Sequence, residues 1–500
     1  MININHASPL TLIFSYSLLA TTLPYSNVQA ESYTYWYSPN FLQPRFYSAE
    51  EGCNFLYSDN WWAHLKSQYM PSNNYYQTPN HLRCATKFTS SGAFNNYFGD
   101  IYRTTIECSN GTKIDMTTGK CQLISQKGHS DSARACENPT ELLGNPINIA
   151  TGNKFQEEID FTTSSFTFSR YYNSLDGVWR HSLSSHLIFK ENEITLIKAD
   201  GSEHLFTSNG TSFISSSDFG NIIHENDHYK YTSQENEVST FTIDGKLSAI
   251  APTNKPRLDL SRQGNAVLVL MDGNQVAKLT EDLLYQPKNF SSDTSSITYS
   301  YNNNRLTSVI TTTNGLSKTK TYQTASNNPN LITSITDENG VKFSTWTYDT
   351  LGRATSSEHA AGAEKITLSY KSDGSVVLTN EYGRKATYRF ALFNGMKRIT
   401  SIEGQPTPNC PSSNSTFTYD AGGLLKTRTD AKGNLTTYDY NDRGLETSRT
   451  EASGTPQART TTTEWHPTLF LKTKVTEPDR ITTYQYDAQG RKTGQIVTPR

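Results

Sequence analysis

A short turn motif that begins with Tyr-Asp recurs in the C-terminal half of this 500-residue chain. Tyr348-Asp349-Thr350-Leu351-Gly352-Arg353 returns as Tyr486-Asp487-Ala488-Gln489-Gly490-Arg491, and looser copies begin at Tyr419-Asp420 and at Tyr440-Asn441. A glycine follows each of these tyrosines by four residues: Gly352, Gly423, Gly444 and Gly490. An aspartate or asparagine side chain can bond the backbone of a turn, and glycine supplies positive φ. The motif therefore predicts tight turns that connect β-strands.

The spacing of the motif predicts the architecture. The four tyrosines lie 71, 21 and 46 residues apart, close to three, one and two units of about 21–24 residues. A unit of this length holds two strands of about five to eight residues and two turns, which is one hairpin. One hairpin is marginal in water, so each unit must pair with its neighbours, and the right-handed twist makes a long sheet coil. We predict a mainly β fold in which residues 256–500 form one extended, curling antiparallel sheet of stacked hairpin repeats.

Composition agrees with sheets that are wetted on at least one face. Hydrophobic residues make up only 34% of the chain, yet aromatic residues reach 11%, which is too many for a disordered chain. The net charge of −2 gives no basic excess for binding nucleic acid or an anionic membrane. We therefore expect no nucleic-acid partner. No run beyond the N-terminus approaches 18 apolar residues, so we expect no membrane span either.

Residues 1–30 have the pattern of a secretory signal peptide. Leu10 to Ala20 is mostly apolar and too short to span a bilayer, and Val28-Gln29-Ala30 fits a small-residue cleavage site. The alternative is a short buried apolar segment. We predict export to the periplasm, the cell surface or the extracellular space.

Five of the six cysteines lie between Cys53 and Cys136, which defines residues 31–138 as a Cys-containing N-terminal region. Export favours disulfides over reduced, buried thiols, although six cysteines allow many pairings. Cys108 and Cys121 enclose two turn-rich segments and are the best single candidate pair. Residues 139–255 contain no cysteine and alternate short strand patterns with Asx-Gly turns, which predicts a β module that precedes the repeats.

The Tyr-Asp-x-x-Gly-Arg units resemble the YD repeats of the RHS (rearrangement hotspot) family. Asn145 to Lys154, Phe168 to Ser174 and Gly177 to His181 are similar to the module that precedes the repeats in many secreted RHS proteins. The resemblance covers roughly residues 139–500. It implies a β-sheet shell that spirals into a hollow cocoon, which in full members encloses a C-terminal toxin domain behind an Asp-Pro-x-Gly self-cleavage motif.

This sequence departs from that pattern because it contains no Asp-Pro-x-Gly. Asp442-Arg443-Gly444-Leu445 has arginine where proline is needed. We therefore expect a wall segment that lacks the toxin part and has a downstream RHS shell or toxin polypeptide as its partner. Its last strands should expose an edge near Arg500, and we expect self-association there because unpaired edges template pairing.

The chain shows no common motif for hydrolysis, zinc binding or phosphate binding, so we predict no enzyme activity, no cofactor and no metal site. His181 and His186 lie five residues apart and would face opposite sides of one strand. Glu464-Trp465-His466-Pro467 gathers an acid, a base and an aromatic ring without a nucleophile, which favours packing at a repeat edge.

The predicted function is a non-catalytic shell that encloses, carries or presents a polypeptide. The alternative is a cell-surface or extracellular adhesion protein that binds glycans. Exposed tyrosine rings on a β surface can stack on sugars, although cross-strand packing favours aromatic residues too.

Overall fold

The computed structural model describes residues 126–129, 139–190, 193–215, 217–393, 395–405 and 414–500, together with Cys53, Cys84 and the backbone of seven earlier strands. The predicted signal peptide and Cys410 lie outside the described residues. So do the side chains of Cys108 and Cys121, and their disulfide stays a prediction. A disulfide joins Cys53 to Cys84, whose Cα atoms are 5.4 Å apart.

The N-terminal strands form two small sheets. In the first, β5 lies between β1 and β4, and β2 and β3 pair with β4; in the second, β6 pairs with β7. Their bounds are β1 Glu31–Tyr37, β2 Gln68–Tyr69, β3 Tyr75–Thr78, β4 His81–Ser90, β5 Ala93–Cys108, β6 Thr112–Asp115 and β7 Lys120–Leu123.

A five-stranded antiparallel sheet follows, which we call the inner sheet. Its order is β12-β11-β10-β9-β8, so each strand pairs with its neighbour in sequence. A register shift between Ile159 and Phe161 places a bulge at Asp160 in β10. The bounds are β8 Leu142–Leu143, β9 Ile147–Asn148, β10 Asn153–Thr162, β11 Thr167–Asn173 and β12 Trp179–His181.

The remaining thirty strands form one antiparallel sheet in strict sequence order, which we call the long sheet. This confirms the prediction of a mainly β chain built as an extended antiparallel sheet. The loop between the strands that end at His359 and begin at Ile366 contains a 3₁₀ turn, Ala360–Gly362. The bounds are β13 His186–Lys190, β14 Glu193–Ile197, β15 Glu203–Ser208, β16 Phe213–Ile214, β17 Asn221–Glu225, β18 His228–Thr232, β19 Val238–Thr242, β20 Leu247–Ala251, β21 Leu258–Gln263, β22 Ala266–Met271, β23 Asn274–Glu281, β24 Pro287–Ser291, β25 Ser295–Asn302, β26 Arg305–Thr313, β27 Leu316–Thr324, β28 Ile332–Thr336, β29 Lys342–Tyr348, β30 Ala354–His359, β31 Ile366–Tyr370, β32 Val376–Thr379, β33 Lys385–Phe393, β34 Met396–Gly404, β35 Ser415–Tyr419, β36 Leu425–Thr429, β37 Leu435–Tyr440, β38 Glu446–Glu451, β39 Arg459–Trp465, β40 Lys472–Thr476, β41 Arg480–Tyr486 and β42 Lys492–Pro499.

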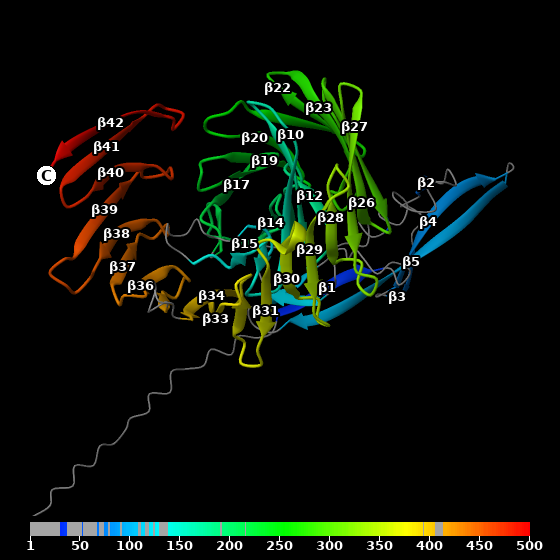
Figure 1. The fold of residues 1–500 in the computed structure, drawn as a ribbon. Coiled ribbons are helices and arrows are strands. Elements are labelled where there is room, and N and C mark those ends of the chain that lie inside the picture. Colours follow the sequence, from blue (N-terminus) through cyan, green and yellow to red (C-terminus); the bar gives the residue numbers. More distant parts are fainter. Residues whose placement is uncertain are drawn as a thin grey trace, which may run out of the picture.

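The long sheet bends around the inner sheet (Figure 1). His181 at the end of β12 bonds Glu281 in β23, and the Ala150 carbonyl after β9 accepts from Lys397 in β34. A flat sheet would separate β23 from β34 by about 50 Å, whereas five strands span only about 20 Å. The inner sheet can reach both only if the long sheet curves, so it lies on the concave side.

The long sheet also returns toward its own beginning. A Cβ on Gly444, in the turn after β37, would lie 2.2 Å from the ring of Phe219, in the loop before β17. The backbone of Phe470 donates to the Asn236 side chain at 2.9 Å, which links the β39–β40 loop to the β18–β19 turn. These contacts join turns rather than strands, so the sheet curls without closing into a ring.

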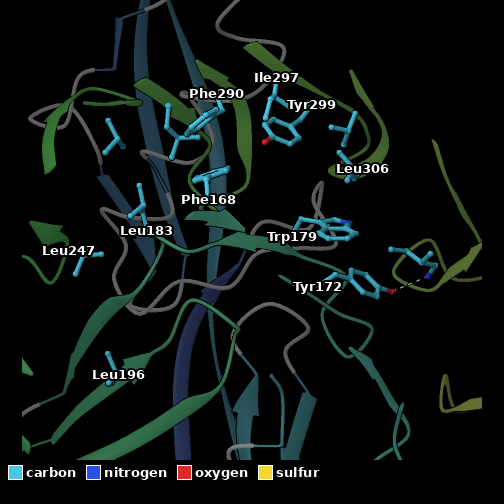
Figure 2. Packing of buried hydrophobic residues seen from close by; sticks show 14 of the residues in the cluster. Phe168, Tyr172, Trp179, Leu183, Leu196, Leu247, Phe290, Ile297, Tyr299 and Leu306 are labelled. Atoms are coloured by element: carbon cyan, nitrogen blue, oxygen red, sulfur yellow. Dashed lines mark hydrogen bonds between the residues drawn. The ribbon is translucent and has the colours of Figure 1, made fainter. Parts of the chain in front are cut away.

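The core lies between the two sheets. Figure 2 shows Phe168, Tyr172 and Trp179 of the inner sheet beside residues of the long sheet, and the ring centroid of Phe168 is 4.5 Å from that of Phe290. These rings are almost fully buried, whereas the strands after β38 have few buried side chains. The concave face is therefore dry where the inner sheet covers it and wet farther along. Within the described part of the chain, no helix is long and apolar enough to cross a membrane.

Candidate functional site

The Tyr-Asp turns share one hydrogen-bond pattern. The Asp349 carboxylate accepts from the backbone N–H groups of Leu351 and Arg353, at 3.0 and 2.9 Å, and from Arg353 Nε at 2.8 Å. Gly352 has φ +79°, which only glycine adopts at low cost. Asp487 forms the same three bonds with residues two and four positions later. The aspartate thus shapes the turn, and the glycine lets the chain reverse.

The tyrosines of the motif connect neighbouring hairpins. Tyr440 ends β37, and its hydroxyl donates to the Leu425 carbonyl in β36 at 2.8 Å. The motif turn joins β37 to β38, so this bond ties its hairpin to the preceding one. We call this contact a staple. Staples of 2.7–2.9 Å run from Tyr301 to Pro287, Tyr348 to Ile332, Tyr370 to Ala354, Tyr419 to Ile399, Tyr440 to Leu425, Trp465 to Glu446 and Tyr486 to Lys472.

Three of these staples come from residues outside the four motif copies, namely Tyr301, Tyr370 and Trp465. Trp465 uses its indole N–H in place of a tyrosine hydroxyl, and it bonds Glu446, six residues after Tyr440. Tyr370 likewise bonds Ala354, six residues after Tyr348. A search for any aromatic donor at the repeat spacing would have found both. His466 caps the following loop by accepting from the Leu469 N–H at 3.1 Å, which fits packing at a repeat edge.

The interface between the two sheets holds a buried charge cluster around Arg170. Arg170 in β11 pairs with Asp160, whose position on the bulge of β10 aims its carboxylate inward. The Tyr299 hydroxyl donates to Asp160 at 2.7 Å, and Arg170 donates to the Tyr322 hydroxyl at 3.1 Å. The Trp179 ring lies 4.6 Å from the guanidinium. Burial opposes the charge of Arg170, but Asp160 outweighs it and raises the pKa of Arg170 above its ordinary value.

A second buried cluster links β12 to β23. His181 Nδ1 accepts from the Leu183 N–H at 3.2 Å, so its Nε2 carries the proton that it donates to Glu281 at 2.8 Å. Arg262 pairs with the other oxygen of the same carboxylate. Burial raises the pKa of Glu281, but the bonds from His181 and Arg262 lower it more. Each cluster holds its ion pair within one sheet, and hydrogen bonds to these charged groups link the inner sheet to the long sheet.

His186 lies in a separate environment. Its ring stacks on Tyr285 with centroids 4.3 Å apart, and its Nδ1–H donates to the Ser184 carbonyl at 2.8 Å. Burial lowers the pKa of His186 to about 4. His181 and His186 thus serve different contacts. Among the described residues, no group of three or more His, Cys, Asp or Glu side chains is placed to hold a metal ion.

An open groove of about 760 Å³ lies between the inner sheet and strands β14–β21. Aromatic rings and carboxylates share its lining, among them Tyr171, Tyr231, Phe241, Glu235 and Glu237. Burial and the neighbouring Glu235 raise the pKa of Glu237. The groove offers stacking surfaces and hydrogen-bond acceptors.

Two segments match known protein families. Residues 144–206 match "Domain of unknown function (DUF6531)", and residues 413–456 match "RHS Repeat". The first covers most of the inner sheet and the start of the long sheet, and the second contains the turns at Tyr419 and Tyr440. No curated protein matches the chain.

Similar solved structures include the Photorhabdus luminescens Tc holotoxin pore with a TccC3 mutation, at 12% identity and a TM-score of 0.27, covering 85% of this chain and 27% of the other. The crystal structure of TcdB2-TccC3 without its hypervariable C-terminal region gives 13% identity and a TM-score of 0.27, covering 89% and 26%. This chain spans about a quarter of the length of those chains.

The RHS match includes two of the Tyr-Asp turns that the sequence marked and the staple that joins their hairpins. The same staple contact recurs from Tyr301 to Tyr486. Residues 413–456 therefore contain an RHS repeat.

Proposed function

We propose that this chain is an exported, non-catalytic wall segment of an RHS-type shell that encloses or carries another polypeptide in toxin delivery. The observation that carries the proposal is the long sheet itself. Thirty strands pair in sequence order, the sheet curves around the inner sheet, and its later turns contact its early ones. A sheet that curves in this way can enclose another polypeptide. The resemblance to secreted RHS proteins implies that this polypeptide is a toxin.

The repeat chemistry supports a structural role. The Asp side chains of the motif bond turn N–H groups, and its Tyr hydroxyls bond strand carbonyls. The aspartate and tyrosine side chains of the motif therefore form hydrogen bonds within the long sheet itself. An enclosed polypeptide should then meet a mostly polar concave face along the later strands.

A protease-protection experiment tests this function. The full chain would be co-expressed with an RHS-type shell or toxin polypeptide as candidate cargo, and the complex would be treated with proteinase K. We expect the partner to resist digestion until the shell is unfolded. A complex in which the partner is digested at the rate of the free polypeptide would contradict enclosure.

Export is tested separately. Glu31 is the expected first residue of the mature protein, so N-terminal sequencing of the exported chain should begin there. A chain that keeps residues 1–30 would contradict the proposed signal peptide. The division into an N-terminal region to 138, a β module to 255 and a repeat array to 500 is part of the same proposal.

The groove favours glycan binding as a second candidate function. It combines the Tyr171 and Tyr231 rings with the carboxylates of Glu235 and Glu237, which are the groups that stack on and bond to sugars. A glycan array probed with the full chain, with Tyr171→Ala as the matched variant, tests it. An array without signal would remove this candidate and leave the shell function untouched.

A further inference from the structure

Four residues ahead of the inner sheet lie against it without joining a strand. Gln126 to His129 follow β7 closely in sequence, and the first three are buried. The Gln126 side chain donates to the Lys397 carbonyl at 3.0 Å. We call this segment the strap, and each of its next three residues has a specific partner on the inner sheet or the adjoining strands.

Lys127 is inserted between two carboxylates. Its side chain is 6% exposed, and its Nζ lies 3.1 Å from Asp176 Oδ2 and 2.7 Å from Glu203 Oε1. Asp176 is fully buried and also pairs with Arg180 at 2.8 Å. A buried ammonium group is stable only when paired in this way. The lysine therefore has a dedicated acidic pocket.

Gly128 fits where no other residue would. Its N–H donates to Asn173 Oδ1 at 2.8 Å, and its φ is +74°. A Cβ at this position would lie 2.3 Å from Asp200 Oδ2. Because Asp200 is itself held by bonds from Ser202, it has little freedom to move away. Backbone conformation and close contact both require glycine here.

His129 completes the contact. Its N–H donates to Asp200 Oδ2 at 2.9 Å, and its ring nitrogens lie 3.3 Å from Asp200 and 3.3 Å from Glu157. The ring packs edge-on to Phe155, with centroids 4.8 Å apart. Hydrogen bonds to Asp200 and Glu157 raise the pKa of His129 to about 9, so the imidazole is charged at neutral pH.

The surface under the strap is acidic, and the strap is basic. Four acidic side chains and one basic side chain line this surface: Glu157, Asp176, Asp200, Glu203 and Arg180. The strap adds two basic side chains, Lys127 and His129, with a glycine between them. We propose that this surface is a binding site for a Lys-Gly-His segment, and that its occupant is the chain's own strap. The strap thereby fastens the Cys-containing N-terminal region to the inner sheet, by a contact that neither the repeat nor the shell function requires.

Lysine acetylation of the full chain tests this proposal. The chain contains a second Lys-Gly pair, Lys432-Gly433, in an exposed turn where Gly433 also has positive φ but no atom within 4 Å of its would-be Cβ. Native protein would be treated with the N-hydroxysuccinimide ester of acetic acid and analysed by mass spectrometry. We expect Lys127 to react at least about tenfold more slowly than Lys432, because its amine is reached only when the strap opens.

The variants Gly128→Ala and Gly433→Ala carry the same backbone strain at two sites. We expect Gly128→Ala to bring the reactivity of Lys127 close to that of Lys432, and Gly433→Ala to leave Lys127 protected. Lys320, which pairs with Glu158 at the sheet interface, should keep its reactivity in both and so report an intact fold. Equal reactivity of Lys127 and Lys432 in the unmodified protein, or continued protection of Lys127 in Gly128→Ala, would overturn the proposal.

Discussion

Each staple joins an aromatic donor to a strand carbonyl across the boundary between two hairpins. The Tyr440 bond to Leu425 illustrates why the motif tyrosine needs its hydroxyl as well as its ring. The Leu425 carbonyl lies six residues after Tyr419, in the strand that follows the preceding motif turn. The motif thus specifies both the turn and the contact with its neighbour.

Tyr440→Phe should lower the free energy of unfolding by about 0.5–1.5 kcal/mol, because the ring stays while the Leu425 carbonyl loses its partner. Urea denaturation followed by tryptophan fluorescence measures this. Tyr382→Phe is the control, since Tyr382 is 78% exposed and should leave stability unchanged. Equal stability of Tyr440→Phe and the parent chain would show that the staple does not hold the hairpins together.

His186 should make stability depend on pH. Burial lowers its pKa to about 4, whereas in the unfolded chain it is about 6.5. The unfolded chain then binds a proton at higher pH than the folded one. Stability is therefore retained above about pH 6.5 and lost as pH falls from 6.5 to 4, by up to about 3 kcal/mol.

Thermal unfolding of the parent chain and of His186→Asn, from pH 7.5 to 4, isolates this contribution. The amide of asparagine can keep the bond to the Ser184 carbonyl but cannot take up a proton. We expect the difference in melting temperature between the two proteins to change across this range. A constant difference would mean that His186 titrates normally in the fold.

At the scale of the elements, the inner sheet is the part on which the long sheet bends. Trp179 is 1% exposed, covers the Arg170 guanidinium and contacts Tyr322 in β27. Trp179→Ala should cost about 3–5 kcal/mol, because it leaves a cavity between the two sheets.

The matched control is Ile159→Ala in β10, since Ile159 is 65% exposed. Chemical denaturation should separate the two variants clearly. If Trp179→Ala were no more destabilising than Ile159→Ala, the inner sheet would not be packed against the long sheet as described.

The edge of β42 belongs to the same scale. Within the described residues β42 pairs only with β41, and Ile496 and Val497 are each 53% exposed. Unpaired edges with exposed apolar side chains template association. Light scattering should show concentration-dependent dimers that Ile496→Lys reduces. A clean monomer at high concentration would contradict this prediction.

Sequence predicted local features best. The turn at Asp349 and the sequential pairing of hairpins follow from the motif and its spacing, because they involve residues close in the chain. The contact between Tyr172 and Ile332 joins residues 160 positions apart and leaves no periodic signal. The pairing of Asp160 with Arg170 could not be predicted from the sequence either, because only the bulge of β10 turns Asp160 toward Arg170. Trp465 was visible as an aromatic residue, but its role depends on a carbonyl that only the fold places beside it.

At the scale of the whole molecule, curvature follows from a few long-range contacts. The inner sheet touches strands from β23 to β34, and Gly444 and Phe470 meet the early part of the sheet near Phe219 and Asn236. These contacts curve the long sheet around the inner sheet and bring its later turns beside its early ones. The proposed shell function depends on that shape more than on any single side chain.

Electron microscopy of the purified full chain tests this claim most directly. We expect one curved sheet that wraps a smaller density on its concave side, with the later hairpins returning beside the earliest strands. Separate compact globules joined by linkers, or a flat ribbon with the inner sheet apart from it, would contradict a long sheet that curves around the inner sheet.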